Sequence, residues 1–174
     1  ENKAKLTGLI AADAIGEVMQ MIQADVPLDM RDNEGNTLLH TAARIGSSRL
    51  VRLLLSRQLS ANTSNHFGDA PLHVAVQRNA LANDPGALSV KQLCERGAEV
   101  DSKNKNGSTP LLEAAASGNI EAIKTLLAYG ANINHQNKKG LSALMLAVTN
   151  NHKAAVALLL EQGADMRLQD NEGD

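Results

Sequence analysis

The sequence predicts an all-α repeat solenoid, and three observations lead to that prediction. A leucine and alanine pattern recurs with a period of 33 residues and one slip of six: Leu39 and Ala42 return at 72 and 75, 111 and 114, and 144 and 147. A turn pattern returns with it, at 32–35, 65–68, 104–107, 137–140 and 170–173. The hydrophobic content of 43% includes one Phe, one Tyr and no Trp, which favours small, closely packed helices. Self-similarity at this period is typical of a linear array of stacked units.

Each turn is expected to lead into a first helix. Asp or Asn opens the turn by bonding its own backbone, and Gly closes it with a positive φ. The residues that precede the helices are Thr37, Ala70, Thr109 and Ser142. The three hydroxyl side chains are predicted to cap the free N–H groups of the first helical turn, whereas Ala70 cannot. Pro71 and Pro110 fit the first helical position, where no amide donor is needed.

A second helix follows in each unit. Gly46 and Gly118 are predicted to end the first helix. Apolar residues at helical spacing, such as Leu50 and Leu54, then predict the second helix. This helix is expected to end at the glycines Gly97, Gly130 and Gly163. Each unit therefore consists of a turn, a helix, a short loop and a second helix.

These motifs resemble the ankyrin repeat. The resemblance is carried by Thr109-Pro110-Leu111, by Pro71-Leu72-His73, by Thr37-Leu38-Leu39-His40 and by the Gly-Ala pairs that end the second helices. It implies a β-hairpin loop plus two antiparallel helices per repeat. It also implies that the imidazoles of His40 and His73 tie neighbouring hairpins together through backbone hydrogen bonds.

The chain is expected to form a single domain, 1–174. The predicted repeats are an N-terminal cap-like unit at about 1–31, then 32–64, 65–103, 104–136 and 137–169, with the start of a further repeat at 170–174. The repeat at 65–103 holds a six-residue insertion near 80–86, which is expected to bulge from the loop between its helices. Insertions of this kind map to loops on one face.

The two end units depart from the pattern. In the first unit either Asp13 replaces the helix-ending glycine, or a shifted alignment places Gly16 there. The last helix is expected over the apolar run 154–160, which is less polar than a terminal cap should be. We therefore expect the chain to be a segment of a longer array, because the outer face of this helix pair would otherwise be partly exposed.

Composition limits the classes of function. The net charge is −2, from 17 basic and 19 acidic residues, so no global field favours nucleic acid or anionic lipid. The longest apolar run is far shorter than a membrane span, and the N-terminus lacks a signal pattern, so no membrane insertion is expected. These features predict an intracellular protein, cytoplasmic or nuclear, and a monomer is favoured.

No enzyme signature, zinc spacing or phosphate loop is present, so no catalytic residue, cofactor or metal is predicted. Cys94 occupies the position of a core leucine in other repeats, and we expect a buried, unreactive thiol there.

The resemblance implies that a partner protein binds the hairpin tips and the exposed side of the first helices, a concave surface. The candidate contact residues there are Glu34, Arg44, His66, Phe67, Asp69, Val74, Arg78, Lys105, Glu113, Lys138, Lys139, Leu141 and Leu146. Phe67 is the sole phenylalanine, at a tip where the repeat requires no aromatic residue.

Charge is unevenly spread over the predicted tips. Acidic residues gather near the first hairpins, whereas Lys103, Lys105, Lys138 and Lys139 lie on later ones. An acidic segment of the partner is therefore expected at the later hairpins. The sequence predicts a non-catalytic protein-protein interaction module. Two alternatives are a substrate-recruiting segment of a larger enzyme or effector, and a masking regulator of a transcription factor.

Overall fold

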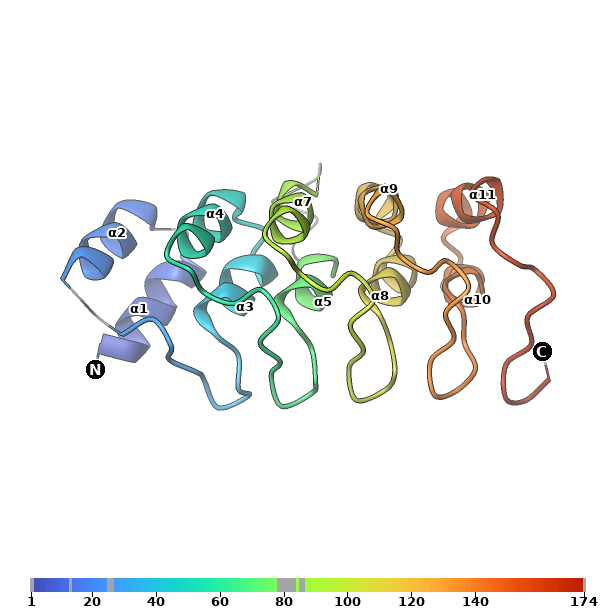
Figure 1. Ribbon diagram of the computed structural model, residues 1–174, viewed down its shortest axis with the longest axis horizontal. Helices are drawn as coiled ribbons and strands as arrows, with labels where there is room; N and C mark the ends of the chain where they lie inside the picture. Colours follow the sequence, from blue (N-terminus) through green and yellow to red (C-terminus); the bar gives the residue numbers. More distant parts are fainter. Residues whose placement is uncertain (1, 13, 25–26, 78–83, 85–86, 174) are drawn as a thin grey trace.

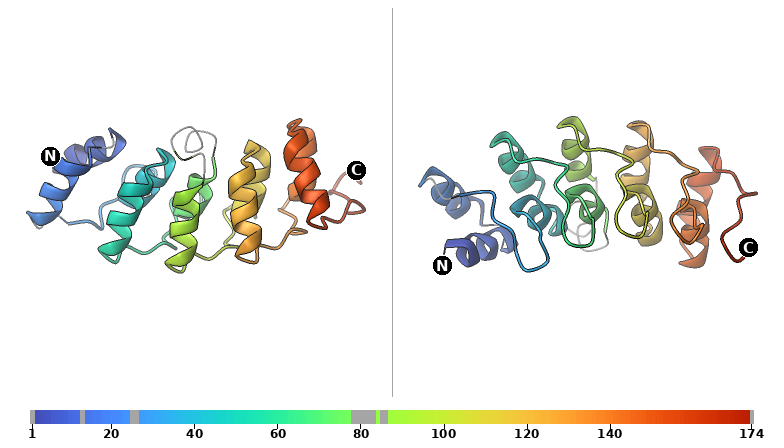
Figure 2. Two further views of the ribbon diagram at one scale, coloured as in Figure 1. Left: turned by 90° about the horizontal axis from the view of Figure 1, so that it is seen from above. Right: turned by 60° about the horizontal axis from the view of Figure 1, so that its bottom comes forward.

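The computed structural model describes residues 2–12, 14–24, 27–77, 84 and 87–173. Its helices stand in two parallel rows along an elongated molecule (Figures 1 and 2). The first helices of the repeats form one row: α1 (Asn2–Ala11), α3 (Leu38–Arg44), α5 (Pro71–Ala75), α8 (Pro110–Ser117) and α10 (Ala143–Thr149). The second helices form the other: α2 (Ile15–Gln23), α4 (Ser48–Ser56), α7 (Leu88–Glu95), α9 (Ile120–Ala128) and α11 (Lys153–Glu161). The predicted all-α repeat solenoid is confirmed.

The loops between repeats project together from the edge beside the first helices (Figure 1). Within the described ranges the β character of these hairpins is limited to one antiparallel bridge, between Arg31 and Thr37. The turns themselves are as predicted. Gly35, Gly68, Gly107, Gly140 and Gly173 have φ values between 73° and 91°.

Most of the predicted helix ends are confirmed. Thr37 accepts from the amide of His40 (3.5 Å) and Ser142 accepts from the amide of Met145 (3.3 Å). Thr109 is the exception, because its buried hydroxyl has no hydrogen-bond partner among the described residues. Gly46 and Gly118 follow the first helices with φ values of 72° and 71°.

The first repeat follows the alignment without gaps. Gly16 lies inside α2, so the shifted alignment that made it a helix end is wrong. The helix α1 instead ends at Ala11, and Asp13 lies outside the described residues.

Most of the six-residue insertion also lies outside the described residues. Its Asp84 is an exception, and the two carboxylate oxygens accept from the amides of Leu88 (2.9 Å) and Ser89 (2.6 Å). Asp84 therefore caps the first turn of α7.

The core is a continuous aliphatic layer between the rows. Leu39, Leu72 and Leu111 are 0% exposed, and alanines one helical turn later in each repeat let the neighbouring first helices pack closely. Cys94 is buried in α7 as predicted, and this burial raises the pKa of its thiol to about 11. At neutral pH the thiol is therefore protonated and a poor nucleophile.

The outer face of the last repeat is apolar and partly exposed, as expected. Val148, Leu160 and Met166 are 59%, 41% and 74% exposed. They line a shallow hollow of about 460 Å³ at the end of the array.

Candidate functional site

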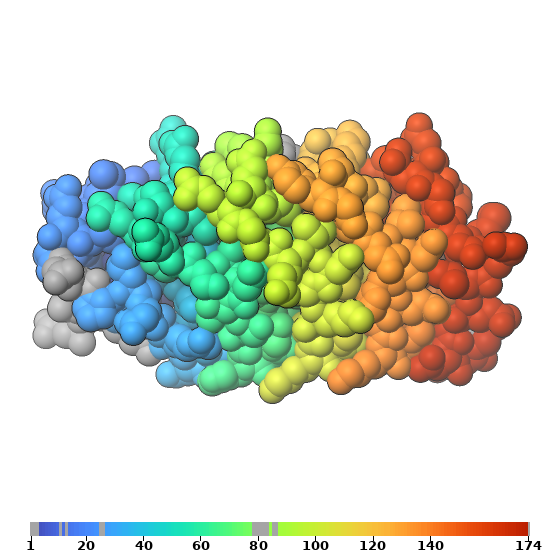
Figure 3. Space-filling model, in the orientation of Figure 1, coloured from blue at the N-terminus to red at the C-terminus, as the bar shows by residue number. Residues whose placement is uncertain are grey.

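The hairpin tips form a continuous surface because each tip is hydrogen-bonded to the next. The amide of His66 donates to the carbonyl of Glu34 (2.8 Å), and the amide of Lys105 donates to that of Phe67 (3.0 Å). Lys138 bonds Asn106 in the same way (3.1 Å), and Asn171 bonds Lys139 (3.1 Å). This ladder holds equivalent tip residues in register. In Figure 3 the loops accordingly form an unbroken lower edge.

Two buried histidines fix the bases of the hairpins. The Nε2 of His40 lies 2.8 Å from the carbonyl oxygen of Asp69, and the Nε2 of His73 lies 3.0 Å from that of Ser108. In both rings Nδ1 accepts an amide N–H, from Thr37 or from Ala70 (3.1 Å each), so Nε2 carries the proton and donates. The role that the resemblance implied for these residues is confirmed.

The basic tips lie where the ladder places them side by side. Lys105, Lys138 and Lys139 are exposed, on the neighbouring hairpins 104–107 and 137–140. None of them forms an ion pair with another described residue. By contrast, Glu34 on the first hairpin pairs with Arg44 of α3 (3.6 Å) and accepts from Asn36 (3.0 Å).

Phe67 is 55% exposed at the tip of the second hairpin. Its backbone is fixed on both sides, because its amide donates to Asn65 (2.9 Å) and its carbonyl accepts from Lys105. The neighbouring His66 lies over Gly35, where an added Cβ would come within 2.6 Å of the imidazole. The ring of Phe67 is thus presented to solvent next to the basic tips.

The candidate positions on and beside the first helices differ in exposure. Val74 is only 3% exposed and packs in the core. Leu141 and Leu146 are half-buried, and Arg78 lies outside the described residues.

A pair of carboxylates lies between the second and third hairpins. Asn104 donates to Asp69 (2.9 Å), and Asp69 lies near Glu113 of α8. Burial raises the pKa of Glu113, and the negative charge of Asp69 raises it further. The role of Asn104 in holding Asp69 in place was not predicted. The Asn that opens each turn was the available signal.

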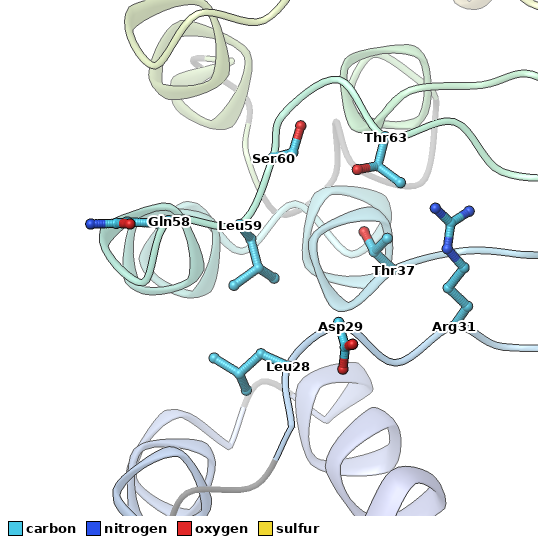
Figure 4. A pocket seen from close by; sticks show the side chains of 8 residues that line it. All are labelled: Leu28, Asp29, Arg31, Thr37, Gln58, Leu59, Ser60 and Thr63. Atoms are coloured by element: carbon cyan, nitrogen blue, oxygen red, sulfur yellow. The ribbon is translucent and has the colours of Figure 1, made fainter.

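A separate cavity of about 360 Å³ lies on the approach to the first hairpin (Figure 4). Leu28, Asp29 and Arg31 line one part of it, and Leu59 and Thr63 another. Its charged groups are one carboxylate and one guanidinium, and Arg31 donates to the carbonyl of Ser64 (3.0 Å). Its described lining holds no nucleophile paired with a base.

The described residues contain neither a metal-binding cluster nor a membrane-spanning helix. In the described parts of the chain, no three His, Cys, Asp or Glu side chains gather as metal ligands would. No described helix has the length and apolar character needed to cross a bilayer.

Known proteins with similar sequences share this repeat. The family described as "Ankyrin repeats (3 copies)" matches residues 9–84 and 80–170. The chain is 36% identical over 97 residues to the tyrosine-protein kinase Shark of Drosophila melanogaster, a match covering 55% of this chain and 10% of Shark.

Two further relatives belong to other kinds of protein. The human transient receptor potential cation channel subfamily A member 1 is 35% identical over 118 residues, covering 66% of this chain and 10% of the channel. The mouse neurogenic locus notch homolog protein 1 is 36% identical over 84 residues, covering 48% of this chain and 3% of that protein. The chain therefore spans about a tenth or less of the length of these relatives.

The family match extends over most of the chain, and the turns, paired helices and histidine bridges have the arrangement that the resemblance implied. Such repeats generally serve as protein-protein interaction modules. The chain belongs to the ankyrin repeat family.

Proposed function

We propose that this chain is a non-catalytic interaction module that holds an acidic segment of a partner protein against its later hairpin tips. The observation that carries the proposal is the set of three exposed lysines, Lys105, Lys138 and Lys139, which have no described ion-pair partner. The ladder supports it, since tips held in register lose little conformational entropy when a partner binds. An intracellular setting, in the cytoplasm or nucleus, and a monomeric state belong to the same proposal.

Phe67 is proposed as the apolar contact beside these charges. An exposed aromatic ring buries a large area at small entropic cost, and such rings are enriched among residues that dominate binding energies. The acidic pair Asp69 and Glu113 lies between its hairpin and the next, and the half-buried Leu141 and Leu146 belong to the repeat two places further along the array. The partner segment that fits has carboxylates on one part and an apolar side chain on another.

The spacing of the array suggests the form of the partner. Packed helices lie roughly 8–10 Å apart, and a polyproline II segment rises about 3.1 Å per residue with three residues per turn. Lysines on neighbouring hairpins would therefore meet acidic side chains three residues apart, which such a segment presents on one face. A 12-residue peptide with Glu at every third position and a single Phe near one end is a suitable probe.

The test is fluorescence anisotropy with this labelled peptide and with a peptide that has Lys in place of each Glu. Lys105→Glu with Lys138→Glu should weaken binding of the acidic peptide about tenfold or more at low salt, and added salt should weaken binding to the unmodified chain. Phe67→Ala should also weaken binding of the acidic peptide, independently of the two lysine substitutions.

The matched control reverses two exposed lysines away from the hairpins, Lys5→Glu with Lys153→Glu. This variant has the same net charge as the hairpin variant, so a pure net-charge effect would weaken both equally. Equal weakening, or equal affinity for the lysine peptide, would contradict the proposed surface.

A second candidate function is substrate recruitment for a larger protein. It is favoured by the small share of each relative that the chain spans, 10% for the tyrosine-protein kinase Shark. In that case the acidic segment would belong to a substrate. Attaching this chain to a tyrosine kinase domain should accelerate phosphorylation of a peptide that joins the acidic segment to a tyrosine, and Lys105→Glu with Lys138→Glu should remove the gain.

A further inference from the structure

A second charged surface lies on the row of second helices, away from the hairpins. The helices α4 and α7 stand side by side there (Figures 1 and 2). A groove of about 250 Å³ runs between them. Its lining comprises Arg52, Leu55, Leu88, Lys91, Gln92, Glu95 and Arg96. It is smaller than the roughly 300–1,000 Å³ of ordinary small-molecule pockets, so its size suits side chains of a docked segment.

The rim of this groove is cationic. Arg52, Lys91 and Arg96 line it, and Arg49 and Arg57 lie exposed on α4 and directly after it. The sole acid among the described lining residues is Glu95, 3.9 Å from Lys91. Arg49, Arg52 and Arg57 form no ion pair with any residue in the described ranges. The charge at this surface is therefore strongly positive although the whole chain carries −2.

The floor of the groove departs from what the repeat requires. Leu88 is 46% exposed, at the position that Arg49 and Glu121 occupy in neighbouring repeats. Gln92 stands where Leu53 stands, and its Oε1 is buried without a hydrogen-bond partner in the described structure. An exposed leucine favours a partner that supplies an apolar side chain.

The distribution of charge along the second helices distinguishes this groove from those between the later repeats. In the register of the second helices Arg52 corresponds to Lys91, Lys124 and Ala157, and Arg57 corresponds to Arg96, Tyr129 and Gln162. Both positions are cationic in the repeats of α4 and α7, one is cationic in the repeat of α9, and neither is in the repeat of α11. Charge complementarity at the pair of helices α4 and α7 therefore selects an acidic occupant.

We propose that the groove between α4 and α7 binds an acidic amphipathic segment of a second protein. An apolar side chain of the segment packs on Leu55 and Leu88. Its carboxylates pair with Arg52, Lys91 and Arg96. This surface is independent of the hairpin tips, so either can be lost without the other.

The experiment uses a labelled 14-residue peptide in which Leu recurs at helical spacing among Glu residues, titrated with the full chain in fluorescence anisotropy. Arg52→Glu with Lys91→Glu should weaken binding at least tenfold, and Leu88→Ser should weaken it about fivefold. Lys124→Glu with Lys153→Glu makes the same change in net charge on α9 and α11 and should alter the affinity less than twofold. Circular dichroism melting establishes that each variant is folded.

Three results would overturn the proposal: equal weakening by the α9 and α11 control, equal binding of a peptide with Gln in place of Glu, or no binding of the acidic peptide to the unmodified chain. A second arm of the experiment measures binding of the chain to vesicles of phosphatidylcholine and phosphatidylserine. If Arg52 and Lys91 are needed for binding to vesicles but not to the peptide, the occupant of the groove is a lipid surface and not a protein segment. The hairpin variant Lys105→Glu with Lys138→Glu should leave groove binding unchanged, which separates this test from that of the hairpin surface.

Discussion

Val76 and Val148 occupy the same place in their repeats but differ completely in environment. Val76 is 0% exposed at the junction between α5 and α8, whereas Val148 is 59% exposed on the outer face of α10. The same contrast holds for Leu55 (6%) and Leu160 (41%). A repeat of this size cannot bury its own apolar face, and the next repeat buries it instead. Stability in this molecule therefore belongs to junctions between repeats more than to repeats themselves.

The largest effect is expected where a junction depends on a buried polar side chain. His73→Leu would leave the amide of Ala70 without its partner and the carbonyl of Ser108 with the amide of Asn104 alone, at a total cost of about 3 kcal/mol in the free energy of unfolding. His66→Leu, at an exposed tip, should cost about 0.5 kcal/mol or less. Urea denaturation followed by circular dichroism measures both, and similar losses would contradict a special role for the junction.

The same histidine should make this junction sensitive to acid. Burial lowers the pKa of His73 below its usual value near 6.5. The unfolded chain therefore binds the proton more readily, so the stabilisation is complete above pH 6.5 and is lost as the pH falls below it. The variant His73→Leu should lose less stability than the unmodified chain over that interval.

The valine pair gives the most direct test of the comparison. Val76→Ala removes two buried methyl groups and leaves a cavity, which should cost about 2 kcal/mol. Val148→Ala should cost about 0.5 kcal/mol or less because Val148 is already exposed to water. Thermal and urea unfolding of both variants check this. Equal costs would show that the outer face of α10 is covered in solution.

A smaller effect is expected at the ends of the second helices. Gln58 has a φ of 63° at the position where Gly97, Gly130 and Gly163 have values of 83° to 87°. A side chain in this left-handed region costs about 1 kcal/mol, so Gln58→Gly should stabilise the chain by that amount. Gly130→Gln should destabilise it similarly. A loss of stability in Gln58→Gly would mean that the glutamine side chain makes a compensating contact.

The repeating features could be predicted from the sequence because one physical solution recurs five times. The turn glycines, the leucine layer and the position of Cys94 follow from the 33-residue register alone. Local departures from the repeat pattern were harder to predict. Among the described residues the hydroxyl of Thr109 has no hydrogen-bond partner, although Thr37 in the same register caps its helix.

The candidate surface was only partly predictable for a related reason. Thr41, Val74, Glu113 and Leu146 share one register position, yet Val74 alone among them is buried. Register gives the direction of a side chain, whereas exposure depends on the residues that neighbouring repeats bring beside it. The groove between α4 and α7 likewise needs two helices from different repeats, which a single-repeat alignment does not bring together.

The ladder of backbone hydrogen bonds between hairpins couples the spacing of the tips to the packing of the helices. Each tip is tied to the next at 2.8–3.1 Å, so the spacing of Phe67, Lys105 and Lys138 is set by how closely the helices behind them pack. The core therefore sets the distances between the tips. A substitution that loosens the contact of α5 with α8 would change these distances and weaken partner binding without altering any residue of the binding surface.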